Sequence, residues 1–192
     1  RRRFAFMEIK TLEEIKSECE KCRGCSLCET RTNVVFGVGN ASAKLMFVGE
    51  APGEKEDLSG VPFVGAAGKL FDKYLAAVGI NREDVYIANI LKCRPPKNRD
   101  PKPEEEDICM EYLRGQVRAI RPKMIVCLGR IAAARLIKPD FKITQEHGVW
   151  FNRGQFEICA VYHPSALLRD PHKKDAMLAD MLAIKAKLDE ME

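Results

Sequence analysis

Eight cysteines are the most chemically distinctive residues of this 192-residue chain. Cys22 and Cys25 form a close pair in a polar segment, whereas Cys93 follows a predicted strand and Cys109 lies on a predicted helix. A close thiolate pair combined with two dispersed thiolates can hold a tetrahedral metal ion or an iron–sulfur cluster. No charged-then-apolar leader that ends in a cleavage site is visible, so we expect no secretion signal. Disulfide scaffolds are normally small and secreted, so we expect no disulfide scaffold here.

The other four cysteines have simpler interpretations. Cys127 and Cys159 lie within apolar segments, which is typical of reduced thiols in a protein core. Cys19 and Cys28 extend the close pair to four cysteines at regular three-residue spacing. Spacing alone therefore does not decide which of these four would bind a metal.

Polar residues and glycines also follow three of the predicted strands. The loop Gly49-Glu50-Ala51-Pro52-Gly53 comes after the apolar segment 45–48, Asn89 ends the next strand, and His163 follows the apolar segment 157–162. Ligands of parallel sheets bind at the carboxyl ends of strands, so these positions are candidates for a binding site. Each also has a simpler interpretation: an acidic solvated turn, a turn-capping amide and a histidine bonded to the backbone.

A basic loop separates two of the cysteine-bearing segments. Residues 92–102 contain five basic residues and one acidic residue, which is a local charge of +4. Such a run suits phosphate groups, although solvated surface runs of this kind are common. The formal charge of the whole chain is +4, which permits an acidic partner such as nucleic acid but does not require one.

Hydrophobic patterning predicts the elements that must position these residues. Apolar segments at 45–48, 85–91, 124–128 and 157–162 indicate strands, and helical spacing is found over 65–78, 104–120 and 175–191. A further helix is expected after Gly129, and a capping box predicts that the first helix starts at Thr11. The alternation of strands and helices predicts an α/β fold with a parallel sheet covered on both faces.

Composition and length set the outer limits. The chain is 46% hydrophobic and 31% charged, which excludes disordered and collagen-like classes. We expect one domain over residues 7–192, preceded at residues 1–6 by a cloning remnant or a disordered extension. No apolar run reaches a membrane-spanning length, so we expect no membrane association.

Six motifs, in order along the chain, resemble those of the family 4 uracil-DNA glycosylases, which are iron–sulfur enzymes of archaea and bacteria. The resemblance extends from Cys22 to Arg169. Each motif alone is modest, but six in register are specific. The motifs are Cys22-x2-Cys25, Arg31-Thr32-x-Val34-Val35-Phe36-Gly37, Gly49-Glu50-Ala51-Pro52-Gly53, Pro62-Phe63-Val64-Gly65, Asn89-x3-Cys93-Arg94-Pro95-Pro96 and His163-Pro164-Ser165.

This resemblance implies a fold, a cofactor and a reaction. The fold would be a single-domain α/β/α sandwich of three layers around a four-stranded parallel sheet. A [4Fe-4S] cluster would be bound by Cys22, Cys25, Cys93 and Cys109, with Cys19 and Cys28 as bystanders. The reaction would be hydrolysis of the N-glycosidic bond of a flipped-out deoxyuridine in base excision repair, which releases uracil and leaves an abasic site.

The resemblance also implies roles for individual residues. Phe63 would stack on uracil, Asn89 would read its N3–H and O4, and His163 would donate a hydrogen bond to O2. Glu50 would steady the sugar cation, and Gly49, Ala51 and Gly53 would complete the uracil site. Better-known families carry an aspartate at Ala51 and a thymine-excluding tyrosine at Gly53, so Glu54 or Glu56 would have to exclude thymine. Leu167 would fill the gap in the base stack, and the expected DNA contacts are Arg169, Lys97 and Arg99.

The partner implied by the resemblance is uracil-containing DNA, single or double stranded, bound by a monomeric protein in the cytoplasm at the nucleoid. Two other functions remain open at this point. One is a non-catalytic DNA-binding module stapled by a metal, and the other is a glycosylase for a different deaminated base such as hypoxanthine.

Overall fold

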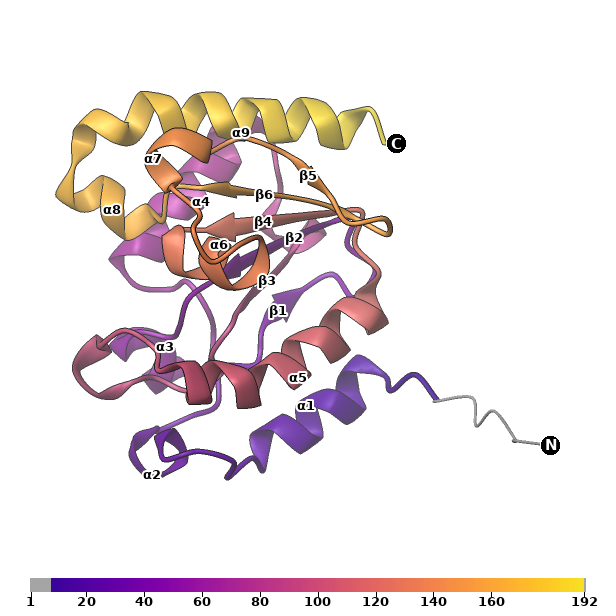
Figure 1. Cartoon of the computed structure of the whole chain (residues 1–192), viewed down its shortest axis with the longest axis vertical. Helices are drawn as coiled ribbons and strands as arrows, with labels where there is room; N and C mark the ends of the chain where they lie inside the picture. The colour runs from indigo at the N-terminus through magenta and orange to yellow at the C-terminus, as the bar shows by residue number, and fades with distance from the viewer. Residues whose placement is uncertain (1–7, 192) are drawn as a thin grey trace.

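A six-stranded sheet in the order β1-β3-β2-β4-β6-β5 forms the centre of the computed structural model (Figure 1). The structure describes residues 8–191, so the expectation for residues 1–6 lies outside the described residues. The four central strands are parallel to one another and confirm the four strands predicted from the sequence. They are β3 (Tyr86–Asn89), β2 (Leu45–Gly49), β4 (Met124–Leu128) and β6 (Glu157–Val161).

The expectation of a four-stranded sheet is wrong, because two short strands are added at its edges. β1 (Val38–Gly39) pairs antiparallel with β3, and β5 (Phe151–Asn152) pairs antiparallel with β6. Each is only two residues long. A two-residue strand carries no alternating hydrophobic pattern, so only the neighbouring strand defines it.

Both faces of the central strands are buried, as expected for a parallel sheet covered by helices. In β2, Leu45 and Phe47 belong to one hydrophobic cluster, and Met46 and Val48 belong to the cluster on the opposite face. All four side chains are at most 1% exposed. The near-continuous apolar sequence of the segment therefore reflects burial on two sides.

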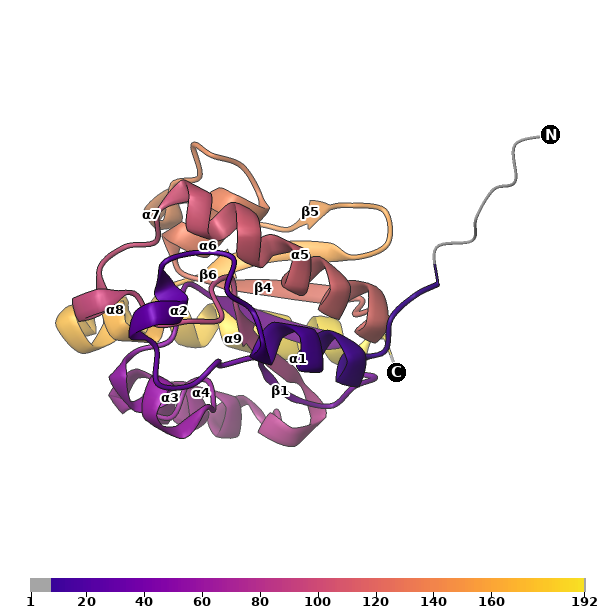
Figure 2. The same cartoon turned by 90° about the horizontal axis from the view of Figure 1, so that it is seen from below.

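Helices cover both faces (Figures 1 and 2). The Leu45 face packs against α4 (Ala66–Val78), α8 (Pro164–Arg169) and α9 (Lys174–Asp189). The Met46 face packs against α5 (Pro103–Ile120) and α6 (Arg130–Leu136), and α1 (Leu12–Glu20) packs against α5. Within residues 8–191, none of the helices is both long and apolar enough to span a lipid bilayer.

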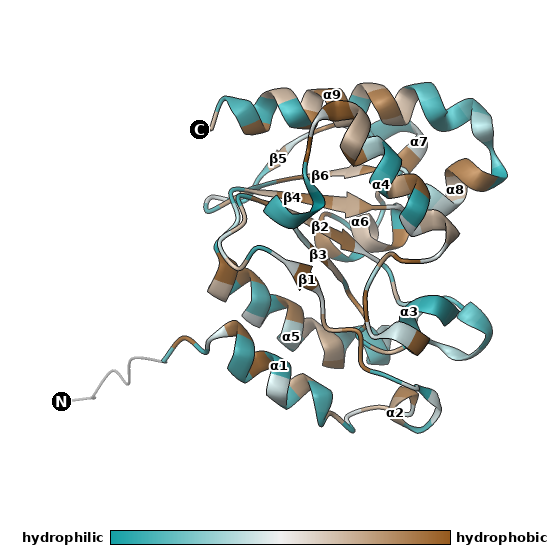
Figure 3. Ribbon diagram, turned by 180° about the vertical axis from the view of Figure 1, so that it is seen from behind, coloured by the Kyte–Doolittle hydropathy of each residue, from teal (hydrophilic) through white to brown (hydrophobic). Residues whose placement is uncertain are grey.

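Shorter elements connect this framework at its polar surface. In Figure 3 the central strands are largely brown, whereas the short helix α3 is mostly teal. The short α-helices are α2 (Leu27–Thr30), α3 (Glu54–Ser59) and α7 (Ile143–Glu146). Short 3₁₀ turns are formed by Arg82–Asp84, Pro96–Asn98 and Pro171–Lys173.

The predicted helix ends are confirmed. Thr11 Oγ1 accepts a hydrogen bond from the backbone N–H of Glu14 at 3.2 Å, and the Glu14 carboxylate accepts one from the N–H of Thr11 at 2.8 Å. This reciprocal capping box satisfies two of the backbone donors left free at the start of α1. Gly79 ends α4 in the left-handed conformation, with φ of 76°.

The structure corrects the role expected of Leu167. Its side chain is 0% exposed and packs in the Leu45-face core, whereas the next residue, Leu168, is 50% exposed. Successive residues of a helix point about 100° apart, so only one of the two can face the sheet. Leu167 is therefore a core residue of α8 and is not placed to enter a base stack.

We predict that Leu167→Ala lowers the free energy of unfolding by about 2–5 kcal/mol, because it leaves a cavity under α8. Leu168→Ala is the matched control and should change this free energy by at most about 0.5 kcal/mol. Urea titrations followed by circular dichroism measure both values. Equal stability of the two variants would contradict the core assignment of Leu167.

Candidate active site

The carboxyl ends of β2 and β3 bring Gly49 and Asn89 side by side in the register of the sheet. A Cβ atom added to Gly49 would lie 2.4 Å from Asn89 Oδ1 and 2.6 Å from Phe63 Cζ. Both distances are too short for any side chain, so this close approach requires glycine at position 49. The structure thus brings together three residues that the sequence assigned to one site.

The side-chain oxygen of Asn89 has no hydrogen-bond partner. Asn89 is 2% exposed, and its Oδ1 is the one buried side-chain polar atom without a partner in residues 8–191. Leaving a buried acceptor unsatisfied costs about 1–3 kcal/mol. Such an atom, held against an aromatic ring at a strand end, indicates a site for a flat ligand that donates a hydrogen bond.

The hydrogen bonds of His163 fix its tautomer. Its Nδ1 accepts a hydrogen bond from the backbone N–H of Ser165 at 3.0 Å and lies 2.7 Å from the Ser165 hydroxyl oxygen. Burial lowers the pKa of His163 to about 4, and the positive charge of Arg169 lowers it further. At neutral pH the ring is therefore uncharged and carries its proton on Nε2. The backbone bond considered as a simpler interpretation is present, and it leaves His163 with a free donor.

The ring of Phe63 lies close to the rings of His163 and Phe71. Its ring centroid is 5.7 Å from that of His163, with 33° between the planes, and 5.7 Å from that of Phe71 in α4. Phe63 has a φ of 52°, a left-handed backbone conformation that is uncommon for a bulky residue.

A cleft lined by both acidic and basic side chains adjoins these residues. Glu50 and His163 line a cleft of about 380 Å³ together with the loop after β2, including Ala51, Gly53, Glu54 and Glu56. Burial raises the pKa of Glu50 to about 7, and the negative charge of Asp100 also raises it. The charges of Arg130 and Arg169 act in the opposite direction. Glu50 therefore changes its charge near neutral pH, where His163 stays neutral.

Six of the cysteines line a second cavity. It is lined by Cys19, Cys22, Cys25, Cys28, Cys93 and Cys109, whereas Cys127 and Cys159 are fully buried in the core as expected. In the described part of the chain, no group of three or more His, Cys, Asp or Glu side chains could hold a metal ion. An iron–sulfur cubane spaces its four cysteines more widely than the ligands of a single ion, so this finding concerns single ions.

Four of these sulfurs receive hydrogen bonds from N–H groups. The backbone of Gly24 donates to Cys22 at 3.4 Å, and Arg31 Nη1 donates to Cys93 at 3.3 Å. Burial raises the pKa of Cys25 and Cys109, and a backbone hydrogen bond from Leu27 to Cys25 and from Lys92 to Cys109 acts in the opposite direction. N–H donors directed at sulfur are typical of cysteines that bind iron–sulfur clusters. Cys19 instead packs against Ile15 and Phe36.

Lys92 links the two sites, and sequence reasoning missed this role. The basic loop suggested a phosphate contact, but the side chain is 1% exposed. Its Nζ donates to the backbone oxygen of Asn89 at 2.8 Å and to Gln116 Oε1 at 2.7 Å. Burial lowers the pKa of Lys92 to about 8. Lys92 is flanked by the apolar residues Leu91 and Cys93. This was the only signal in the sequence that the lysine side chain points inward.

The expected DNA contacts separate into free and engaged residues. Lys97 and Arg169 are exposed, and the charge of Arg169 acts on both Glu50 and His163, which places it near the cleft. Arg99 is different, because its two terminal nitrogens bond to Glu105 at 3.0 and 2.6 Å. Glu105 is only 2% exposed, so Arg99 neutralises a buried carboxylate and is not a free phosphate ligand.

Comparison with known proteins assigns the family. The sequence model of the uracil DNA glycosylase superfamily matches residues 36–184. The chain is 48% identical to the type-4 uracil-DNA glycosylase of Archaeoglobus fulgidus over 184 residues, which cover 92% of each chain. It is 44% identical to that of Thermotoga maritima over 163 residues, covering 83% of this chain and 84% of the relative. The chain therefore belongs to the uracil DNA glycosylase superfamily and, within it, to the type-4 uracil-DNA glycosylases.

Proposed function

We propose that this protein is a monofunctional uracil-DNA glycosylase of base excision repair, which hydrolyses the N-glycosidic bond of deoxyuridine and leaves an abasic site. The unpaired Oδ1 of Asn89 carries this proposal. Uracil presents an N3–H donor beside its O4 acceptor, which matches the oxygen and the NH₂ group of one amide. Cytosine presents the reverse pattern, so it would leave both amide groups buried and unpaired.

The geometry supports a division of labour around the flipped base. Phe63 offers its ring as a stacking surface, and the Nε2–H of His163 donates to uracil O2, where negative charge grows as the bond to the sugar breaks. A neutral donor suits this role, because it needs no change of protonation during the reaction. Glu50, when ionised, stabilises the positive charge that develops on the sugar.

We further propose that Cys22, Cys25, Cys93 and Cys109 bind a [4Fe-4S] cluster. This ligand set is supported by the cavity that the four cysteines share and by the N–H donor directed at each sulfur. When bound, the cluster would cross-link the segment before α2, the loop after β3 and helix α5. The substrate loop, residues 50–53 after β2, rests on this region, because Ala51 packs against the hydrophobic cluster that contains Cys93 and Cys109.

For DNA, we propose that Leu168 takes the role that Leu167 cannot fill. It is exposed on α8 and lies next to Arg169, whose charge reaches the cleft. Arg169 and Lys97 would contact phosphates on either side of the extruded nucleotide. Uracil-containing DNA, single or double stranded, is the proposed partner, and one chain supplies every residue of the site.

Of the predictions about function, the first tests the activity itself. An oligonucleotide with one central uracil should break at that position after incubation with the protein and heating in alkali, and a thymine oligonucleotide should stay intact. Asn89→Ala should lower the rate about 100-fold or more, because a buried donor–acceptor pair for uracil is lost. Asn152→Ala, on edge strand β5, is the control and should keep full activity.

The outcomes separate the competing functions. Binding of the uracil oligonucleotide without release of uracil would support the non-catalytic DNA-binding module. Release of hypoxanthine in preference to uracil in a competition assay would support the other glycosylase. Strand breaks before alkali treatment would contradict a monofunctional enzyme.

The second prediction concerns pH. Because the pKa of Glu50 is raised to about 7, its carboxylate forms as the pH rises through this value. The kcat/KM for uracil release should therefore fall about tenfold per pH unit below pH 7. His163, with a pKa of about 4, should add no further change between pH 5 and 8. Glu50→Gln should be slow and show a flat profile over this range, and an unchanged profile would remove Glu50 from the mechanism.

The third prediction concerns the cysteines. Cys93→Ala should lose the bound iron and its visible absorption, because one of four ligands is missing. Cys19→Ala is the matched control, since Cys19 lines the same cavity, and it should keep its iron. The number of iron atoms per protein molecule is measured for both variants by plasma emission spectroscopy after anaerobic purification. Full iron in Cys93→Ala would show that the ligand set is wrong.

A further inference from the structure

The loop that carries Phe63 is held in a strained conformation. Phe63 has a φ of 52°, and left-handed backbone conformations are unfavourable for non-glycine residues. Such strain persists only where the surrounding structure imposes it. The contacts of Pro62–Gly65 therefore indicate what keeps the aromatic ring in place.

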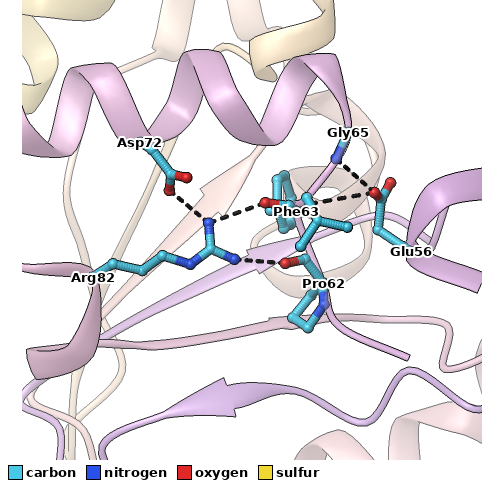
Figure 4. A network of polar contacts seen from close by, with 7 residues as sticks. Glu56, Pro62, Phe63, Gly65, Asp72 and Arg82 are labelled. Atoms are coloured by element: carbon cyan, nitrogen blue, oxygen red, sulfur yellow. Dashed lines mark hydrogen bonds and ion pairs between the residues drawn. The ribbon is translucent and has the colours of Figure 1, made fainter. Parts of the chain in front are cut away.

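Arg82 holds the loop from one side (Figure 4). Its Nη2 donates to the carbonyl oxygen of Pro62 at 2.6 Å, and its Nη1 donates to that of Phe63 at 3.0 Å. Nη1 also pairs with Asp72 of α4 at 2.6 Å, which fixes the guanidinium against that helix. A planar guanidinium is suited to two neighbouring carbonyls, because its donors form a rigid fork.

Glu56 holds the loop from the other side. Its Oε2 accepts hydrogen bonds from the backbone N–H groups of Val64 at 3.3 Å and Gly65 at 2.9 Å. Its Oε1 accepts one from Gly53 at 3.2 Å, in the substrate loop after β2. The carbonyls of the strained turn thus face a cation and its N–H groups face an anion.

The loop also rests directly on α4. A Cβ atom added to Gly68 would lie 2.1 Å from the carbonyl carbon and oxygen of Phe63, so the helix admits the loop only at a glycine. This contact fixes the distance of the loop from α4. It does not fix the rotation of the turn, which the bonds to Arg82 and Glu56 determine.

We propose that Arg82 is a positioning residue that acts on uracil only through Phe63, as half of an Arg82–Glu56 clamp on the loop Pro62–Gly65. The proposal rests on the proposed function. Arg82 touches the loop through backbone atoms, whereas the Phe63 ring lies against Gly49 and His163. The clamp fixes the Phe63 ring in the orientation needed for stacking before uracil binds. This reduces the conformational entropy that is lost on binding.

A double-mutant cycle on the purified protein tests this route. Arg82→Ala should lower kcat/KM for uracil release about tenfold in the wild-type background and have little further effect in the Phe63→Ala background. Affinity for DNA that already contains an abasic site should stay unchanged, because no base is stacked there. Arg114→Ala is the control, since Arg114 pairs with Glu111 on the exposed surface of α5 and should be neutral in both backgrounds.

Hydrogen exchange supplies a readout that does not depend on catalysis. Arg82→Ala should speed exchange of the Val64 and Gly65 amides while the amides in the middle of α4 keep their protection. Arg82→Lys, which keeps the positive charge but lacks the fork of two terminal nitrogens, should give an intermediate result, and it serves if Arg82→Ala does not fold.

Each failure has its own signature. An equal loss in the wild-type and Phe63→Ala backgrounds, or unchanged exchange at Val64 and Gly65, would overturn the clamp while leaving uracil release intact. A wild-type protein that releases no uracil would overturn the proposed function, and the exchange measurement would still decide whether Arg82 holds the loop.

Discussion

The rest of the site depends on the buried side-chain oxygen of Asn89, which has no hydrogen-bond partner within residues 8–191. Asn89 ends a central strand, and its neighbour in the sheet is a glycine with no room for a side chain. The ring of Phe63 fills the space beside both. The free protein already bears the desolvation cost of this unsatisfied acceptor. A ligand donor that bonds to it therefore adds the free energy of the hydrogen bond without a further desolvation cost at Asn89.

The five residues from Asn89 to Cys93 join two functions in one short segment. Asn89 faces the proposed uracil site and Cys93 faces the cysteine cavity, while Lys92 between them turns inward and bonds the backbone of Asn89. A buried lysine is costly unless its donors are satisfied, and here Asn89 and Gln116 accept from it. The segment is thus a direct connection, which gives a hydrolase a physical reason to carry a cluster of thiols close to the residue proposed to read the base.

Two groups that line the cleft, His163 and Glu50, have pKa values shifted in opposite directions. Burial and the charge of Arg169 lower the pKa of His163, which keeps it neutral, whereas burial raises the pKa of Glu50 to about 7. A donor and a carboxylate can therefore work together over a wide range above pH 7. The charge of Arg169 favours this state in both groups, because it lowers the pKa of each.

The sequence by itself determined the α/β class, the four parallel strands, the capped ends of α1 and α4 and the family. These follow from local patterns of polarity and from motifs whose order needs no coordinates. The roles of Leu167, Arg99 and Lys92, the two edge strands and the Arg82–Glu56 clamp were decided only by the tertiary structure. In each case the deciding contact lies across the fold or depends on which way a side chain turns: Leu167 faces the core, Arg99 meets a buried carboxylate, and Arg82 reaches a loop 20 residues away. Sequence spacing carries no information about such contacts, because they depend on packing and side-chain direction in the folded chain, even where the two residues, such as Arg99 and Glu105, are only six positions apart.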